Sequence, residues 1–459
     1  MAEFGTTSEE RYTLTDGSRV AVVGAGVAGS MFSYFLLQFA DRLGIEIELD
    51  IFEPKDFTNR GPKGCNRCGG IVSESLVQSL ATEGINLPSS VVQRGIEAYV
   101  LHTDAGTVRI DTPVGEKRIA AIHRGGGPLK GPESTWESFD GYLLNLALQK
   151  GARLINEAVA DIEWVQDHPH LTTESISQSR YDLVVIATGV NTTSKFFAHI
   201  NPNYTPPQQT RTMIREYSLP DGQVHKYLGD AMHLFLLNLP RLEFAAIIPK
   251  GDTATMCMLG EDIDKALLDS FLSHNTVGQC LPESPGDCQA CGCSPYMALS
   301  AAKKPFADRV IFIGDCGVSR LYKDGIGAAY RTAKAAASTA AFQGVSAKHF
   351  AGGFQKACKG IINDNRYGHV VFFVTKLIQK SEIAQRGVLR MVEREQSQPD
   401  KPQRMSAVLW DTFTGSAPYK EIFYRTLNPA YVFELCRNLL AASISGNSAV
   451  PSSKQQEAK

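Results

Sequence analysis

The residues with the clearest chemical meaning lie near the N-terminus, in the run Gly24-Ala25-Gly26-Val27-Ala28-Gly29. In such a G-x-G-x-x-G spacing the first glycine makes a tight turn after a strand, the second lets a pyrophosphate approach the backbone, and the third lets a helix pack closely. Phosphates then lie at the helix N-terminus, where N–H groups are free. We therefore expect a dinucleotide to be bound by Gly24, Ala25, Gly26, Ala28 and Gly29.

An acidic residue follows at the place where the ribose of such a dinucleotide needs one. The segment 47–52 alternates in polarity and ends at Glu53-Pro54. A carboxylate there accepts hydrogen bonds from ribose hydroxyls. Glu53 lies further from the glycines than the usual ~20 residues because the intervening helix is long. Strand, turn, helix, strand and acid agree, so we expect Glu53 to contact the cofactor.

Two later segments indicate which dinucleotide is bound. Residues 182–189 (Asp-Leu-Val-Val-Ile-Ala-Thr-Gly) form an apolar strand ending in a small-residue turn, and Val310 to Asp315 delivers an aspartate to a glycine-framed loop. Both resemble motifs of the FAD-binding superfamily that includes p-hydroxybenzoate hydroxylase. By this resemblance the cofactor is FAD, and its ribityl chain is bound by Gly314 and Asp315.

A second helix start follows in the same region, at Lys323-Asp324-Gly325-Ile326-Gly327. The resemblance implies that Asp324, Gly325, Ile326 and Gly327 lie at the flavin, with the helix N-terminus facing its pyrimidine oxygen. The positive end of the helix dipole would then stabilise the anionic reduced flavin. The sequence has no second G-x-G-x-x-G, which argues against the reductases that bind two dinucleotides.

The run Gly64-Cys65-Asn66-Arg67-Cys68-Gly69-Gly70 is the most distinctive stretch of the chain. It resembles the Cys-Gly-Gly turn of the geranylgeranyl reductase family of FAD enzymes. Residues 138–152 (Ser-Phe-Asp-Gly-Tyr-Leu-Leu to Lys-Gly-Ala) and 314–317 (Gly-Asp-Cys-Gly) look like two further motifs of that family. The resemblance covers about residues 18–345.

The resemblance implies that reduced FAD delivers a hydride to an isoprenoid double bond, that a proton completes the reduction, and that Cys68 is the functional cysteine. It also implies an electron donor such as NAD(P)H or ferredoxin. Two positions depart from the pattern. The arginine that usually opens the helix near 138 is replaced by Glu137-Ser138, with Arg124 as the candidate substitute, and the Pro-x-x-Gly-Glu-Gly loop appears as residues 322–327.

The remaining cysteines leave several interpretations open. Cys65-x-x-Cys68 fits a redox dithiol, or half of a zinc site completed by Cys288-x-x-Cys291. Cys280, Cys288, Cys291 and Cys293 have no standard iron–sulfur spacing. Buried free thiols, which behave as small apolar side chains, are the simplest alternative. The ten histidines show no ligand spacing, so we predict no metal ligands.

These motifs require an α/β fold to position them. We expect a Rossmann-like FAD-binding domain from residues 18–95, 140–190 and 305–345, with an inserted antiparallel β-rich substrate domain from 96–139 and 191–304. A helical C-terminal region should cover 346–445, with a polar break at 396–403. Residues 1–17 and 446–459 read as flexible tails. Three tryptophans are expected in the core or a pocket: Trp136, Trp164 and Trp410.

Composition narrows the partners and the location. The net charge of −2 and the absence of a basic stripe argue against nucleic acid. No signal peptide is expected, because residues 1–19 are polar, and no apolar run reaches the ~18 residues of a membrane span. We expect a cytoplasmic protein, or one peripheral to the inner membrane surface. The apolar C-terminal segments around Phe373 and Leu440 favour core helices that close over the substrate cavity, with contact with a lipid surface as the alternative.

Three functions are compatible with this reading. The first is reduction of carbon–carbon double bonds in an isoprenoid or lipid-like substrate. The second is an FAD-dependent monooxygenase on the same fold. The third, of another class, is a flavin-containing electron-transfer or assembly subunit with a cysteine-bound metal.

Overall fold

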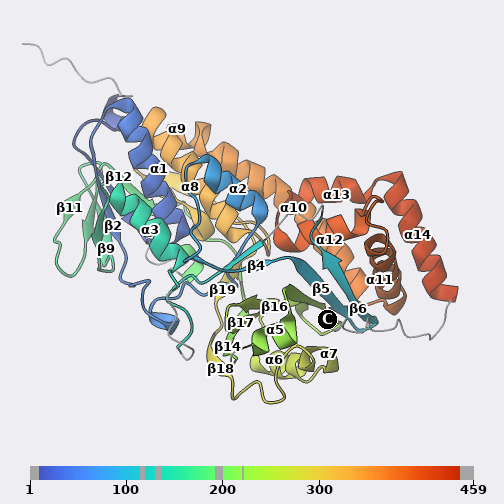
Figure 1. Ribbon diagram of the computed structural model, residues 1–459. Coiled ribbons are helices and arrows are strands. Elements are labelled where there is room, and N and C mark those ends of the chain that lie inside the picture. Colours follow the sequence, from blue (N-terminus) through green and yellow to red (C-terminus); the bar gives the residue numbers. More distant parts are fainter. Residues whose placement is uncertain (1–9, 114–118, 130–135, 192–199, 220–221, 445–459) are drawn as a thin grey trace, which may run out of the picture.

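The computed structural model describes residues 10–113, 119–129, 136–191, 200–219 and 222–444 (Figure 1). Two large β-sheets and a group of C-terminal helices make up this part of the chain. The predicted α/β class is confirmed, with a mainly parallel sheet, a mainly antiparallel sheet and a helical C-terminal region.

The N-terminal glycine motif directly follows β1, which is an inner strand of the first sheet. Its order is β20-β21-β12-β1-β2-β8, and every neighbouring pair is parallel except β20 with β21. Because parallel strands are covered on both faces, they are apolar throughout, and all four residues of β12 are buried. The strands are β1 (Ser18–Val23), β2 (Ile47–Phe52), β8 (Arg153–Ile155), β12 (Leu183–Ile186), β20 (Phe306–Ala307) and β21 (Val310–Phe312).

The two faces of this sheet have different covers. Alternate residues such as Val20 and Val22 pack against helices, whereas Ala21 and Val23 pack toward a small antiparallel sheet of β9 (Asp161–Val165), β10 (His168–Thr172) and β11 (Ser179–Arg180). The alanine side of α8 allows α1 to pack closely along it, and both helices run side by side in Figure 1. The helices on this face are α1 (Val27–Leu43), α2 (Glu74–Thr82), α3 (Phe139–Gln149) and α8 (Gly325–Phe342).

The second sheet has seven strands in the order β18-β14-β17-β16-β15-β5-β6. All pairs are antiparallel except β5 with β15, which corrects the expectation of a wholly antiparallel domain. The exception arises because the chain leaves β5 and β6, passes through the first sheet, and returns to add β15 in the same direction. The strands are β5 (Ala98–Thr103), β6 (Gly106–Asp111), β14 (Met213–Ser218), β15 (Ala231–Leu236), β16 (Leu242–Lys250), β17 (Thr253–Gly260) and β18 (Gln289–Cys293).

Helices cover both faces of the second sheet. One face, including Phe235 and Ile247, packs on α5 (Gln223–Leu228), α6 (Lys265–Leu272) and α7 (Asn275–Gly278). The other packs on the C-terminal helices, where Trp410 is fully buried and stacks on Tyr99 with ring centroids 4.7 Å apart. These helices are α10 (Phe354–Gln379), α11 (Glu382–Gln396), α12 (Arg404–Thr414), α13 (Tyr419–Thr426) and α14 (Pro429–Ile444), whereas α9 (Ala347–Gly352) packs beside β20 and α8 of the first sheet.

Short strands connect the expected domains. Strands β3 (Ile71–Val72) and β4 (Val92–Ile96), from the segment expected in the nucleotide domain, pair with β7 (Ile119–Ile122) from the segment expected in the substrate domain. A two-stranded ribbon joins β13 (Gln209–Arg211) to β19 (Tyr296–Ala298). The structure thus intertwines the two segments more than their sequence boundaries indicate.

Three expectations about the periphery differ from the structure. Trp136 and Trp164 are each 38% exposed, and the Trp164 indole only donates a surface hydrogen bond to the Ile200 carbonyl, 3.0 Å away. Residues 10–17, expected in a flexible tail, include a buried Leu14. The rest of the expected tails, 1–9 and 446–459, lies outside the described residues. Within the described part of the chain, no helix is long and apolar enough to cross a bilayer.

Candidate active site

A cavity of about 610 Å³ lies where the carboxyl edge of the first sheet meets the second sheet. We call it the central cavity. The ends of β1, β2, β12 and β21 all reach it because parallel strands end at the same edge. Of the residues predicted to bind cofactor or act in catalysis, Ala25, Gly29 and Gly327 do not line it, whereas the following do: Gly24, Gly26, Ala28, Glu53, Cys68, Gly314, Asp315, Asp324, Gly325 and Ile326.

The structure favours glycine at each of the three positions of the first motif for a different reason. Gly24 has φ +104°, and a Cβ there would lie 2.8 Å from the Ala187 carbonyl oxygen. A Cβ on Gly29 would lie only 1.8 Å from the Gly24 carbonyl oxygen, so this glycine lets α1 pack on the turn. A Cβ on Gly26 would meet nothing closer than 3.6 Å. Packing does not require Gly26, whose bare backbone leaves room for a ligand in the cavity.

The N-terminus of α1 points its unpaired backbone groups at this space. Gly26 is the N-cap residue, and no side chain among the described residues caps the helix. Glu53 instead binds the turn itself, because its carboxylate accepts the N–H groups of Ala25, at 2.9 Å, and Lys55, at 3.1 Å. Glu53 therefore fixes the glycine turn in addition to lining the cavity, a role that the sequence did not predict.

A positive group lies directly beside Gly26. Arg124 donates two hydrogen bonds of 2.7 Å to Asp140, a fully buried carboxylate in the first turn of α3. Its Nη2 is the atom closest to a Cβ built on Gly26. Burial lowers the pKa of Arg124, but Asp140 more than offsets this and the pKa is raised above its usual value. Arg124 thus occupies the position that the sequence proposed for it, at the N-terminus of the helix near 138.

Asn66 and Lys55 lie beside the Arg124–Asp140 pair and line the central cavity. Asn66 donates to Asp140 at 3.2 Å and accepts from Lys55 at 2.9 Å. Burial lowers the pKa of Lys55, with Glu53 opposing the shift. Arg124 and Lys55 place two cations beside an open helix N-terminus, which is the arrangement that a diphosphate requires. Lys55 could not be recognised from the sequence, because one lysine in a glycine-rich loop carries no signal of its own.

The second helix start lies on the same side of the cavity. Gly314 approaches α1 so closely that a Cβ would lie 2.8 Å from the Cβ of Ala28. Burial raises the pKa of Asp315, with a Ser319 hydrogen bond opposing the shift. Asp324 caps α8 by accepting the Gly327 N–H at 3.1 Å, and its carboxylate also pairs with two arginines. What α8 offers a ligand is therefore the backbone of Gly325 and Ile326 rather than the Asp324 side chain.

The Cys-Gly-Gly turn packs tightly between the two sheets. A Cβ on Gly69 would lie 2.9 Å from the Cys257 sulfur, and one on Gly70, where φ is +71°, would lie 2.1 Å from the Ile122 carbonyl oxygen. Cys68 lines the central cavity, and its Sγ accepts the Gly70 N–H at 3.4 Å. Close approach to β17 and β7 explains why two glycines must follow Cys68.

The far part of the cavity is apolar with one cation in its wall. Lys323 lies over the Phe244 ring, with its Nζ 4.4 Å from the centroid, and 5.7 Å from that of Phe413. Burial among these groups lowers the pKa of Lys323 to about 7, with Cys257 opposing the shift. The apolar lining comes from the second sheet, β3 and α12: Ile71, Ile214, Met232, Phe244, Ala246, Ile248, Met258 and Phe413.

The metal sites that the cysteine spacings suggested do not form among the described residues. All ten cysteines are free thiols. Across the described ranges, the one group of three or more side chains close enough to hold a metal is His102, His233 and Cys280. Cys65 and Cys68 therefore do not make a zinc site with Cys288 and Cys291, and Cys280 lies apart from Cys291 and Cys293. No signal in the sequence indicated this histidine–cysteine group.

Solved structures that resemble this chain include flavoproteins and enzymes of low sequence identity. No protein-family model matches the sequence, and no curated protein matches it. A solved flavoprotein/dehydrogenase from Cytophaga hutchinsonii is similar, with a TM-score of 0.57 and 13% identity over 93% of this chain and 99% of that one. The halogenase PltM has a TM-score of 0.58 and 10% identity over 95% and 93%. The tetracycline destructase Tet(51) has a TM-score of 0.51 and 15% identity over 86% and 98%.

The chain has the fold of FAD-dependent oxidoreductases. PltM has been solved in complex with phloroglucinol and FAD. The predicted α/β fold, with a mainly parallel sheet, a mainly antiparallel sheet and a helical C-terminal region, is thereby confirmed as one that solved flavoproteins share. In this fold, the central cavity is lined by Arg124, Lys55 and the α1 N-terminus, and also by Cys68 and Lys323.

Proposed function

We propose that this protein is an FAD-dependent reductase of carbon–carbon double bonds in an isoprenoid or other lipid-like substrate. The observation that carries the proposal is the apolar half of the central cavity, which has Cys68 and Lys323 in its wall and continues directly into the polar half beside Gly26. An elongated apolar substrate fits the first half and a dinucleotide fits the second. The Cys-Gly-Gly resemblance to geranylgeranyl reductases supports the same assignment.

The residues present fit FAD. The bare backbone of Gly26 and the open start of α1 suit a pyrophosphate, and Arg124 and Lys55 suit its charge. Asp315 is placed to accept hydrogen bonds from a ribityl chain, and the backbone at Gly325 lies at the positive end of α8. Bound in its reduced form, FAD would supply the hydride for the reduction.

Lys323 is the proton donor that we propose for the second half of the reaction. Addition of a hydride to one carbon of the double bond requires a proton at the other. A lysine with a pKa of about 7 is half protonated at neutral pH, so its Nζ can both release a proton and regain one from water. Phe244 and Phe413 hold the ammonium at the cavity wall. Cys68, in the same wall, would position the substrate.

Two partners belong to the proposal. The electron donor would be NAD(P)H or ferredoxin, since the chain has a single dinucleotide motif and needs an external reductant. A lipid surface would supply the substrate. On α10, Val370, Phe373, Val374 and Leu377 are 43–62% exposed and fall on one helical face, which suits a peripheral contact with a bilayer.

The test uses the purified flavoprotein reduced under anaerobic conditions and mixed with geranylgeranyl substrates in detergent. Reoxidation of the flavin, together with a gain of two hydrogens per reduced double bond by mass spectrometry, is the expected result. Flavin that stays reduced, with unchanged lipid, would sink the reductase proposal. Binding of FAD is read separately from the visible spectrum, so a flavin-free protein would overturn the cofactor assignment itself.

A monooxygenase is the second candidate, because PltM and Tet(51), whose names denote a halogenase and a tetracycline destructase, have the same fold. That function predicts substrate-dependent oxygen consumption in the presence of NADPH. The same preparation assayed with an oxygen electrode separates the two functions, since the reductase consumes no additional oxygen when lipid is added.

A further inference from the structure

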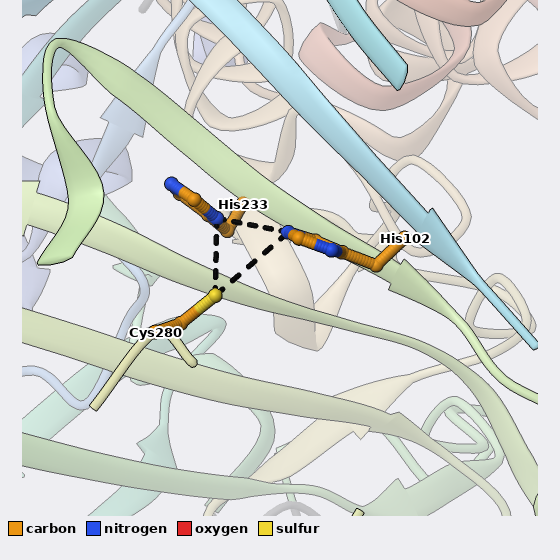
Figure 2. A group of neighbouring side chains, drawn as sticks. All are labelled: His102, His233 and Cys280. Atoms are coloured by element: carbon orange, nitrogen blue, oxygen red, sulfur yellow. Dashed lines mark hydrogen bonds between the residues drawn. The ribbon is translucent and has the colours of Figure 1, made fainter. Parts of the chain in front are cut away.

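Three side chains far apart in the sequence meet in the β-rich part of the molecule (Figure 2). His102 lies on β5, His233 lies on β15, and Cys280 follows directly after α7. The ring nitrogens His102 Nε2 and His233 Nδ1 are 2.9 Å apart, and the Cys280 sulfur lies 3.8 Å and 3.2 Å from them. All three residues are buried, with at most 8% of any one exposed.

The strand register explains how the two histidines meet. In the parallel pair of β5 and β15, His102 is opposite Phe235 and His233 is opposite Val100. Residues two apart on a strand point to the same face, so the two imidazoles lie diagonally on one face of the sheet. The adjacent residue Met232 lines the central cavity. His233 therefore points to the opposite face, away from the flavin.

The remaining ring nitrogens have partners that set the tautomers. His233 Nε2 donates to the Leu228 carbonyl at 3.2 Å, which leaves a lone pair on Nδ1. His102 Nδ1 is 3.0 Å from the Thr107 hydroxyl, which can accept its proton and so leave a lone pair on Nε2. Histidine ligands of metals almost always donate their second N–H to such a partner.

The protonation states also suit ligands. Burial lowers the pKa of His102 to about 3, with His233 adding to the shift, and burial lowers that of His233 to about 4. Both imidazoles are therefore neutral at pH 7. Burial raises the pKa of Cys280 to about 12, so only an adjacent cation would keep this sulfur as a thiolate.

We propose that His102, His233 and Cys280 bind one zinc ion through two nitrogens and a thiolate, with water as the fourth ligand. Zinc favours nitrogen and sulfur ligands in a tetrahedral arrangement, whose bond lengths place two nitrogens about 3.3 Å apart and a nitrogen and a sulfur about 3.6 Å apart. The observed separations differ from these values by a few tenths of an ångström. The ion would join β5, β15 and the α7 segment, independently of the flavin.

The main experiment measures metal in the intact protein. The flavoprotein, freed of any affinity tag, is equilibrated with zinc, dialysed against metal-free buffer, and analysed by mass spectrometry of the elements. We expect one zinc ion per chain. Cys280→Ser should lower the zinc affinity by at least about tenfold, because it removes a ligand. Cys358→Ser is the matched control, since Cys358 is a thiol with the same 2% exposure on α10, and it should keep the ion.

A second measurement needs no variant. Zinc-edge X-ray absorption of the wild-type protein should give two nitrogen ligands and one sulfur ligand. A chain that stays zinc-free, that takes up copper but no zinc, or that holds zinc without sulfur would overturn the proposal, as would equal zinc content in the two serine variants. Zinc-free protein would mean that the three groups form only a buried hydrogen-bonded cluster.

Discussion

At the scale of single residues, the central cavity combines groups whose neighbours change their chemistry. Lys323 is the clearest case, because an ammonium held between Phe244 and Phe413 loses hydration that two aromatic faces only partly replace. Its pKa of about 7 lies well below the ordinary value for lysine. Arg124 shows the opposite shift, because its pKa is raised. The fully buried carboxylate of Asp140 stabilises the charged guanidinium beside the glycine turn.

The lowered pKa of Lys323 predicts how the rate of lipid reduction depends on pH. Below pH 7 the ammonium form dominates, and above it each pH unit removes about nine-tenths of the proton donor. The rate of lipid reduction by pre-reduced enzyme should therefore fall as pH rises through about 7. Lys323→Met should lower the rate at pH 6 by about 100-fold or more and abolish that falling limb.

The measurement is the rate of flavin reoxidation by substrate in a stopped-flow instrument from pH 5.5 to 9. Lys265→Met serves as the control, because Lys265 is an exposed residue of α6 that pairs with Asp269, and it should leave the profile unchanged. If the rate of the Lys323→Met variant still fell as pH rose through about 7, the proton donor would be another group.

At the scale of elements, the start of α1 decides whether the cofactor can bind. Packing accounts for Gly24 and Gly29, whereas Gly26 is kept bare for a ligand. Glu53 then fixes the turn through the Ala25 N–H, so β2 and the glycine loop are held as one unit. A small displacement of α1 would move the helix N-terminus away from Arg124, with which it would bind the diphosphate under the proposed function.

Gly29→Ala tests this coupling. The new methyl group would lie 1.8 Å from the Gly24 carbonyl oxygen, so α1 must shift, at a cost of about 1–3 kcal/mol in the free energy of unfolding. We expect FAD affinity to fall by at least tenfold, measured from flavin fluorescence during dilution.

The control is Gly360→Ala, the same change inside α10, where a Cβ would meet nothing within 4 Å. Alanine is the better helix former there and should raise stability by up to about 1 kcal/mol without changing the affinity for FAD. Equal FAD affinity in the two variants would contradict the role given to the α1 start.

At the scale of the whole molecule, the C-terminal helices are part of the site. They pack on β5 and β6 through a core that includes Trp410 and Tyr99, and Phe413 of α12 reaches the central cavity. Figure 1 shows these helices beside the second sheet, remote from the glycine motif in the sequence. Removing the packing of Trp410 on Tyr99 should therefore destabilise the fold and, with it, the apolar part of the central cavity.

Trp410→Ala should lower the free energy of unfolding by about 3–5 kcal/mol, since the indole is fully buried. The urea midpoint followed by circular dichroism gives the change. Trp136→Ala is the matched control, because Trp136 is 38% exposed, and it should cost about 1 kcal/mol or less. A Trp410 variant as stable as this control would show that the helical region folds independently of the sheet.

Much of the fold was determined by local sequence. The alternating segment 47–52 forms a strand with those bounds, because alternation of polarity is a local signal. The glycine motif likewise fixed the position of the dinucleotide turn. These features depend on residues within a few positions of one another, which is the range over which a single sequence is informative.

The tertiary structure alone decided which distant residues meet. His102, His233 and Cys280 show no ligand spacing in the sequence, and a parallel strand pair with one adjacent loop brings them together. Likewise, the pKa of Lys323 is lowered by burial, which arises only when β16 and α12 pack around the lysine. Spacing along the chain encodes turns and helix faces, but contacts between separate elements, and the burial that changes a pKa, exist only once those elements have packed.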